Sequence, residues 1–260
     1  MYCLKCNHKE IARLFAEQEA NGIHNIPVFV ISYNRLSYVE KMVRILENSG
    51  YRNIHIIDNA STYPPLLDYL RKTSCDVVRM KENKGHMVFW HDSRFDKYRN
   101  NFYVVTDPDI EPISECPNDF IERFFFILKE HPYVRKVGFS LKIDDLPKNG
   151  ILSDAVFEWE KQFYEIKIKD VYYADIDTTM ALYMPDIYCK HLNFYRAFRT
   201  AFPYVAKHLP WYKSKDDITE EDIYYSEHKI TGWWNPLKSN DLEEHQVEER
   251  ENSRCLPPPN

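Results

Sequence analysis

The first 80 residues alternate between apolar runs and stretches in which apolar residues recur at helical spacing. Strands are predicted over 26–31, 53–57 and 76–80, of which 26–31 is a nearly continuous apolar run. Such a run is typical of a strand that is buried on both faces of a parallel sheet. Helices are predicted between these strands, over 36–46 and 65–72. This β-α-β-α-β order predicts a parallel sheet with helices on its faces, and right-handed crossovers bring the carboxyl ends of its strands to one edge.

The rest of the chain continues the pattern less regularly. Further helices and strands are expected over these ranges: helices 9–20, 87–98 and 118–131, with Asn118 as the N-cap of the last, and strands 102–105 and 136–141. Residues 144–154 are polar and are expected to form a loop. Aromatic and β-branched residues over 157–160 and 162–168 suggest an antiparallel excursion, and 171–185 is predicted to be one strand.

Length and composition agree with one domain. The chain has 260 residues, of which 44% are hydrophobic and 15% aromatic, enough for one full-sized core. We therefore predict a single α/β domain with a Rossmann-like, doubly wound mixed sheet. Its expected parts are a helical extension over 1–25, two halves of one domain over 26–115 and 116–237, and a flexible acidic tail over 238–260.

Charge and hydropathy exclude several classes of protein. The formal net charge is −6, and residues 241–251 hold six acids and one arginine, so this segment supplies most of the excess. There is no basic stripe of the kind that nucleic acid binding requires. No apolar run is long enough to span a bilayer, and residues 1–10 lack the apolar core of a signal peptide, so we expect a cytoplasmic protein. A peripheral contact with a membrane would leave no mark in this sequence.

The six cysteines leave two interpretations open. In a cytosolic protein they are expected to be free thiols. Cys3 and Cys6, followed by His8, have the spacing that begins a zinc site, but no second ligand pair with matching spacing follows.

Polar residues follow three of the predicted strands. Ser32–Arg35 follows the first strand, Asp58–Thr62 the second, and Asp107 and Asp109 the strand at 102–105. The carboxyl ends of parallel strands are where open α/β sheets bind ligands. Two carboxylates this close repel each other unless a cation joins them, and hard divalent cations prefer oxygen ligands and substrate phosphates. The pattern predicts a metal site that holds a diphosphate, although Asp and Pro are also ordinary turn residues.

The order of these motifs resembles that of the family 2 nucleotide-sugar glycosyltransferases, which have the A-type glycosyltransferase fold. The matching segments are Val30–Arg35, Ile57–Thr62, Asn83-Lys84-Gly85 and Val105–Asp109. The resemblance covers about the first 115 residues. It departs at the second motif, which often carries two acids in the family, because Asn59 here follows a single Asp58.

The resemblance implies a set of site residues. Mn²⁺ or Mg²⁺ would be bound by Asp107 and Asp109, with His208 as an additional ligand. The nucleotide would contact residues of all four motifs, namely Ser32, Tyr33, Asn34, Arg35, Asp58, Asn83, Gly85 and Asp107. The alternative for most of them is an ordinary solvated turn.

A general base is expected among carboxylates of the second half. Asp175 and Asp177 are two residues apart, so on a strand they would share a face, and we favour Asp177 as the base. Glu221 lies in the acidic run 220–222, which is the competing candidate. The structural alternative for that run is a helix N-terminus capped by Thr219, whose first turn the acids would stabilise.

The resemblance implies an inverting, metal-dependent transfer of a sugar from a nucleotide-sugar donor to a hydroxyl of an acceptor. A UDP-sugar is the favoured donor, and the acceptor would be a glycan or a lipid-linked glycan. Such a reaction would suit the synthesis of a cell-surface polysaccharide. One rival is a nucleotidyltransferase that makes the sugar nucleotide, but Ser32–Arg35 lacks the glycine-rich phosphate loop that it would need. The other rival is a non-catalytic nucleotide- or glycan-binding module on the same fold. The sequence does not indicate an oligomeric state.

Overall fold

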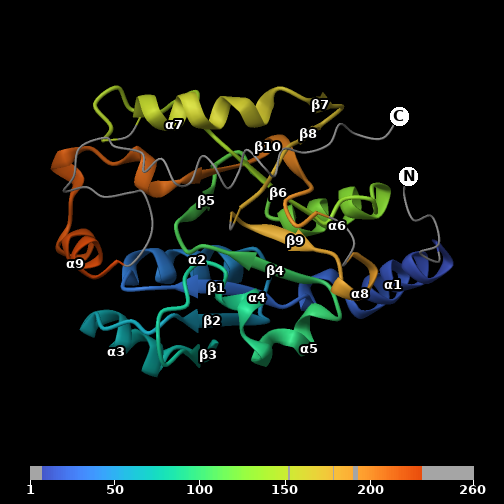
Figure 1. Cartoon of the computed structure of the whole chain (residues 1–260), viewed down its shortest axis with the longest axis horizontal. Coiled ribbons are helices and arrows are strands. Elements are labelled where there is room, and N and C mark those ends of the chain that lie inside the picture. Colours follow the sequence, from blue (N-terminus) through green and yellow to red (C-terminus); the bar gives the residue numbers. More distant parts are fainter. Residues whose placement is uncertain (1–7, 152, 178, 190–192, 230–260) are drawn as a thin grey trace.

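The computed structural model of the protein describes residues 8–229, apart from 152, 178 and 190–192 (Figure 1). The predicted acidic tail, Cys3 and Cys6 therefore lie outside the described residues. The α-helices are α1 (His8–Asn21), α2 (Leu36–Asn48), α3 (Pro64–Lys72), α4 (Val88–His91), α5 (Asp96–Arg99), α6 (Phe120–Glu130), α7 (Ser153–Glu160), α8 (Asp186–Cys189) and α9 (Glu220–His228).

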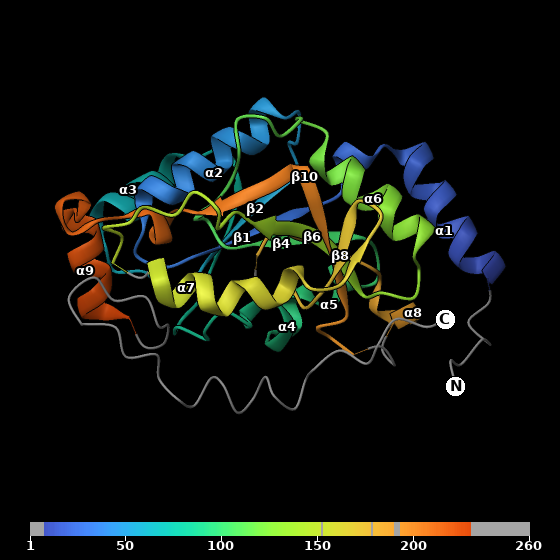
Figure 2. The ribbon, with the colours of Figure 1, turned by 90° about the horizontal axis from the view of Figure 1, so that it is seen from above.

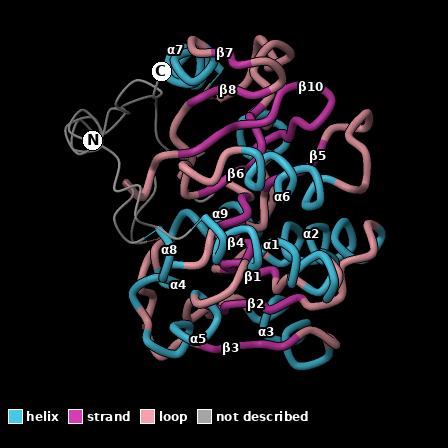
Figure 3. Tube along the Cα trace, turned by 90° about the vertical axis from the view of Figure 1, so that its right-hand side faces the viewer, coloured by secondary structure: helices cyan, strands magenta, loops and turns pink. Residues whose placement is uncertain are grey.

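The strands of the described chain form one mixed sheet. They are β1 (Val28–Ser32), β2 (Ile54–Asp58), β3 (Asp76–Arg79), β4 (Tyr103–Thr106), β5 (Ile110–Pro112), β6 (Lys136–Leu141), β7 (Lys167–Ile168), β8 (Val171–Tyr173), β9 (Ala181–Tyr183) and β10 (Ala197–His208). Their order is β3-β2-β1-β4-β9-β6-β10-β8-β7, with β5 paired to β10. Figure 3 shows this stack from β3 at one edge to β7 at the other.

Strands β3, β2, β1 and β4 form the parallel half of the sheet that the sequence predicted. β1 pairs in parallel with β2 and β4, and β2 pairs in parallel with β3. β9 then runs antiparallel to both β4 and β6, so it joins the parallel half to the second half of the sheet. The fold is therefore the predicted Rossmann-like mixed sheet with helices on both faces.

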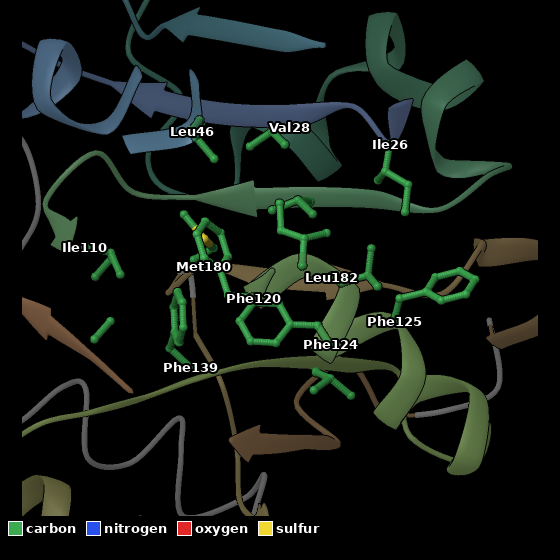
Figure 4. Close-up of a cluster of buried hydrophobic side chains, with 14 of the residues drawn as sticks. Ile26, Val28, Leu46, Ile110, Phe120, Phe124, Phe125, Phe139, Met180 and Leu182 are labelled. Atoms are coloured by element: carbon green, nitrogen blue, oxygen red, sulfur yellow. The ribbon is translucent and has the colours of Figure 1, made fainter. Parts of the chain in front are cut away.

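Both faces of the central strands are buried, which explains their continuous apolar runs. Alternate residues of β1 point to opposite faces: Val28 and Val30 belong to one hydrophobic cluster, and Phe29 and Ile31 to the other. Helices α2 and α6 lie on the first face, whereas α4 and α7 lie on the other side of the sheet (Figure 2). Figure 4 shows the larger cluster, in which the phenylalanines of α6 pack against strands of both halves.

Two predictions about helices were wrong in detail. Residues 87–98 form α4, a 3₁₀ turn at Ser93–Phe95, and α5 instead of one helix. The break lies at Asp92, whose backbone is extended and whose side chain accepts a hydrogen bond from the Arg94 N–H. Helix α6 begins at Phe120, so Asp119 rather than Asn118 occupies the N-cap position.

The second half differs more from prediction. Residues 157–160, expected to be extended, belong to helix α7, which also shortens the polar loop at 144–154. Only Lys167–Ile168 of the expected antiparallel excursion forms a strand, paired with β8. The predicted strand 171–185 is instead β8 and β9, which lie apart in the sheet. Strand β10, which no pattern predicted, pairs with β5, β6 and β8.

Within the described residues, no helix combines the length and the apolar character that crossing a membrane would require.

Candidate functional site

The loops at the carboxyl ends of β1 and β2 are tied together by Asn34. The backbone of Asn34 is left-handed, with a φ of 51°, a conformation that asparagine tolerates. Its side-chain oxygen accepts hydrogen bonds from the backbone N–H of Thr62 at 2.7 Å and of Tyr63 at 3.0 Å. Its own N–H donates to Ser61 Oγ at 3.0 Å. Asn34, predicted to contact the nucleotide, therefore shapes the edge of the site.

Asp58, a predicted nucleoside contact, is fully buried at the end of β2. One carboxylate oxygen accepts a hydrogen bond from the Ser61 N–H at 2.9 Å, and the other lies 3.4 Å from Arg79 Nε. Ser32, at the end of β1, is in register with Asp58 and is also fully buried. The structure thus brings both predicted residues together beneath the rim of the sheet, which we define as the loops at the carboxyl ends of β1, β2 and β4.

Asn59 holds the next loop, a role that the sequence analysis missed. Its side-chain amide donates to Asn83 Oδ1 at 2.8 Å and to the Gly85 carbonyl at 3.0 Å. Its side-chain oxygen accepts from the Lys84 N–H at 2.9 Å. Gly85 has a φ of 73°, which explains the glycine. The only signal in the sequence was the departure from the family pattern at this position.

Asp109 is the centre of the charged part of the rim. Its side chain is 14% exposed, and one oxygen lies 3.6 Å from Arg35 Nη1. The other oxygen, Oδ1, lies 3.6 Å from His208 Nε2, is buried, and has no hydrogen-bond partner among the described residues. The antiparallel pairing of β5 with β10 places His208 opposite Ile110, next to Asp109. The structure therefore brings together Asp109 and the late histidine.

The protonation state of His208 suits a ligand. Burial lowers the pKa of His208 below its usual value, and the Asp109 charge opposes this effect only in part. The imidazole is therefore neutral at pH 7 and has a free electron pair. A separation of 3.6 Å is too long for a hydrogen bond but is possible for two ligands that each lie about 2.1 Å from one divalent ion.

These donors fit a divalent ion only in part. No three His, Cys, Asp or Glu side chains form a metal-binding group in the part of the chain that the structure describes. Mg²⁺ is often bound by one or two protein ligands and completes its shell with water and substrate phosphates. The buried oxygen of Asp109 fits an ion of that kind, whereas the imidazole nitrogen of His208 is a ligand that transition-metal ions accept more readily than Mg²⁺ does.

Asp107 lies beside this pair on the same turn. Its carbonyl accepts a hydrogen bond from Thr106 Oγ1 at 2.7 Å, and its side chain is partly exposed. Burial raises the pKa of Tyr225, and the charges of Asp109 and Asp107 raise it further. Asp107 therefore contributes negative charge between the end of β4 and helix α9.

Helix α9 packs against the loops that follow β1 and β2. Thr219 caps it through the predicted N-terminal arrangement, in which Thr219 and Asp222 exchange hydrogen bonds. Glu221, a candidate base, accepts hydrogen bonds from the backbone N–H and the Oγ of Ser37, at the start of α2. The Tyr33 hydroxyl donates to the carbonyl of His228 at 2.7 Å. These contacts hold α9 against the loop that follows β1.

Arg35 connects α9 to Asp109. Its guanidinium lies 3.6 Å from an Asp109 oxygen and 3.8 Å from Asp222 Oδ1. It also stacks on Tyr225, at 4.0 Å from the ring centroid, and its side chain is only 5% exposed. Arg35 was predicted to bind the nucleotide, but its link to Asp222 was not predicted.

Asp175 and Asp177 do not lie on a strand, so the argument that a strand places them on one face was wrong. They lie in the irregular segment between β8 and β9. Burial lowers the pKa of Lys136 to about 7, and the charges of Asp177 and Asp175 oppose this shift. Both carboxylates therefore act on the same buried ammonium, whose side chain also lies 3.4 Å from the Tyr183 hydroxyl.

Comparisons with known proteins add little to this geometry. No protein-family model matches the chain. No curated protein matches it either. Among solved structures, it is similar to UDP-glucose pyrophosphorylase complexed with UDP-glucose, with 12% sequence identity and a TM-score of 0.40, over 78% of this chain and 100% of that chain. A likeness of this size supports no conclusion about function, so the function must be argued from the site.

Proposed function

We propose that the protein is a glycosyltransferase that moves a sugar from a nucleoside-diphosphate donor, first of all a UDP-sugar, to a hydroxyl of a glycan acceptor with inversion. The observation that carries this proposal is the charged rim. Asp109 lies at the carboxyl end of a central strand, next to the neutral His208 and the buried Arg35. This edge of a Rossmann-like sheet is where such folds bind their ligands.

The loops after β1 and β2 are the proposed nucleoside site. An aromatic ring such as that of Tyr33 can stack on a base. Asp58 is fully buried, so it would support the loop beneath the nucleoside through the hydrogen bond that it accepts from the Ser61 N–H. Asn34, Asn59 and Ser61 hold these loops in place. The diphosphate would then lie toward Asp107 and Asp109.

A divalent ion held by Asp109 and His208, with Asp107 beside them, would neutralise the departing diphosphate. The chain itself supplies a further positive charge. Arg35 is a permanent cation at the same edge, and its burial strengthens its interaction with an anionic ligand.

The proton of the acceptor hydroxyl passes to a carboxylate as the hydroxyl oxygen bonds to C1 of the sugar. The bond between C1 and the diphosphate oxygen breaks at the same time on the opposite face, and its electrons leave with the diphosphate. We keep Asp177 as the first candidate for this base. Glu221 is less suitable because its carboxylate already accepts hydrogen bonds from Ser37.

The test is a calorimetric titration of UDP with and without Mn²⁺, followed by assays of UDP release from a panel of sugar donors. UDP should bind more tightly with Mn²⁺, and Asp109→Asn should remove that gain while the protein stays folded. Asp68→Asn, on the exposed surface of α3, is the matched control because it makes the same change away from the rim. UDP binding that is absent in wild type, or unaffected by Asp109→Asn, would contradict the proposal.

The same assays separate the rivals. A nucleotidyltransferase would form a UDP-sugar from UTP and a sugar 1-phosphate and would release inorganic diphosphate. A non-catalytic module would bind UDP but would turn over no donor. Asp177→Asn should leave UDP affinity intact and reduce transfer by roughly a hundredfold.

A further inference from the structure

Arg35 lies between two carboxylates that belong to different elements. Asp109 follows β4 and Asp222 is in the first turn of α9, and the guanidinium lies 3.6 Å from one and 3.8 Å from the other. Both separations exceed hydrogen-bond length. All three side chains are largely shielded from water, with exposed fractions of 5% for Arg35, 14% for Asp109 and 2% for Asp222. Their charges therefore interact more strongly than charges on the surface.

Asp222 is a fixed anion. Its Oδ2 accepts hydrogen bonds from the Thr219 N–H at 3.0 Å and the Thr219 hydroxyl at 2.7 Å, and from Lys213 Nζ. These donors hold the pKa of Asp222 below its usual value although burial acts in the opposite direction. With Oδ2 engaged in this way, Oδ1 is the oxygen that faces Arg35. Asp222 can therefore receive the guanidinium without moving itself.

Arg35 can shift between the two anions without leaving its aromatic support. Its guanidinium lies over the rings of Tyr225 and Tyr38, at 4.0 Å and 4.9 Å from their centroids. Sliding a planar cation over these rings preserves the stacking. A movement of less than 1 Å toward either carboxylate would bring it to hydrogen-bond distance, by comparison with the usual length of about 2.9 Å.

We propose that Arg35 and Asp222 form a charge-exchange pair that sets the affinity of Asp109 for a divalent cation. When a cation binds Asp109, the like charge displaces the guanidinium toward Asp222, which compensates for it. Asp222 is then a positioning residue that acts through Arg35. This inference rests on the metal-binding part of the proposed function and adds a role for α9 in it.

The test is a double-mutant cycle in which Mn²⁺ binding is measured directly, from the electron paramagnetic resonance signal of free Mn²⁺, without donor or acceptor. Asp222→Asn removes the charge of one of the two carboxylates beside Arg35 and should weaken Mn²⁺ binding by a factor of about 5 or more. Arg35→Gln removes the competing cation and should tighten binding by a similar factor. In the Arg35→Gln background, Asp222→Asn should change the affinity by less than about twofold, because the side chain through which it acts is gone.

Two controls locate the effect. Asp109→Asn should abolish the Mn²⁺ binding and thereby place the ion at Asp109. Glu220→Gln removes the same charge from the same helical turn, but Glu220 is exposed, so the affinity should stay at the wild-type value. Circular dichroism of each variant checks that it is folded. If Asp222→Asn does not fold, Arg35→Gln decides alone, and binding no tighter than wild type would overturn the inference.

The outcomes separate this inference from the proposed function. Equal effects of Asp222→Asn in both backgrounds, or no Mn²⁺ binding in wild type, would overturn the exchange pair. Sugar transfer by such a protein would still support the glycosyltransferase. Conversely, a coupled cycle in a protein that turns over no sugar donor would support the exchange pair and count against the transferase.

Discussion

At the scale of single residues, the loop at 83–85 depends on the side-chain amide of Asn59, which a carboxylate could not replace. Asn59 donates two hydrogen bonds and accepts one, and all three go to the loop at 83–85. An aspartate could accept the third but could donate neither of the others. The departure from the family pattern at this position therefore has a physical reason, which becomes visible only when the partners of Asn59 are known.

Asn59→Asp should loosen the loop at 83–85. The substitution removes both donated bonds and places a carboxylate against two oxygens in a site where Asn59 is 2% exposed. We expect a loss of about 1–3 kcal/mol in the free energy of unfolding, the usual scale for unpaired buried groups. Urea denaturation measures it, with Asn101→Asp, at an exposed position, as the control. Equal stability of the two variants would show that the loop does not need these bonds.

Lys136 should make stability depend on pH. Burial lowers its pKa to about 7 in the folded protein, from about 10.5 in the unfolded chain. Between these values the unfolded chain holds more protons, so the free energy of unfolding should rise with pH. Lys136→Met removes this contribution. Between pH 7.0 and 8.5, wild type should therefore gain about 1.5 kcal/mol relative to the variant.

Urea denaturation of both proteins at the two pH values measures this difference, and the subtraction cancels the other titrating groups. If the difference in free energy of unfolding between wild type and Lys136→Met is the same at both pH values, Lys136 keeps an ordinary pKa in the folded protein. The neighbouring charges of Asp177 and Asp175 would then balance the effect of burial completely.

At the scale of elements, the sequence predicted those whose signal is local. The runs that became β1 and β2, and the helical spacing of α2 and α6, need no knowledge of their partners. The segment 171–185 was misread because β8 pairs with β10 whereas β9 lies between β4 and β6. Local alternation shows that a segment can be extended but does not show which strand it will pair with.

Strand β10 was not predicted, and Pro203, which lies within it, is a residue that argues against a central strand. The structure accommodates Pro203 where the pairing with β6 shifts register, between Thr200 and Val205. Strand β10 then carries His208 to Asp109. Asp109 and His208 were predicted as partners by resemblance, but Asp222 could not be paired with Arg35 because that contact depends on where α9 packs.

Glu221→Ala should loosen α9. The carboxylate accepts hydrogen bonds from Ser37, in the first turn of α2, where a negative charge is also favourable. We expect a loss of about 0.5–2 kcal/mol and faster hydrogen exchange in α9. Glu220→Ala, one residue away and exposed, should be close to neutral. If Glu221→Ala instead keeps its stability and UDP affinity but loses transfer, then Glu221, rather than Asp177, would be the base.

At the scale of the whole molecule, β9 joins two halves with different tasks. The parallel half carries the loops of the proposed nucleoside site, and the second half carries β10 and Lys136. β9 contacts β4 on one side and β6 on the other. The approach of β9 to β6 is unusually close at Gly138, because a Cβ added there would lie 2.3 Å from the Met180 carbonyl oxygen and 2.8 Å from the Ala181 Cβ.

Gly138→Ala should therefore destabilise the junction between the halves. The clashing atoms are the Met180 carbonyl oxygen and the Cα and Cβ of Ala181, none of which a side-chain rotation can move away, so we expect a loss of about 1–3 kcal/mol or more. Hydrogen exchange should accelerate in β6 and β9 first, while β1 and β2, which are paired with each other, stay protected. Gly85→Ala is the control for the loss of a glycine, because its Cβ would meet nothing within 4 Å and only its φ of 73° is unfavourable. UDP affinity should survive in Gly138→Ala, since the proposed nucleoside loops belong to the parallel half. Uniform acceleration of exchange across all strands would show instead that the sheet opens as one cooperative unit.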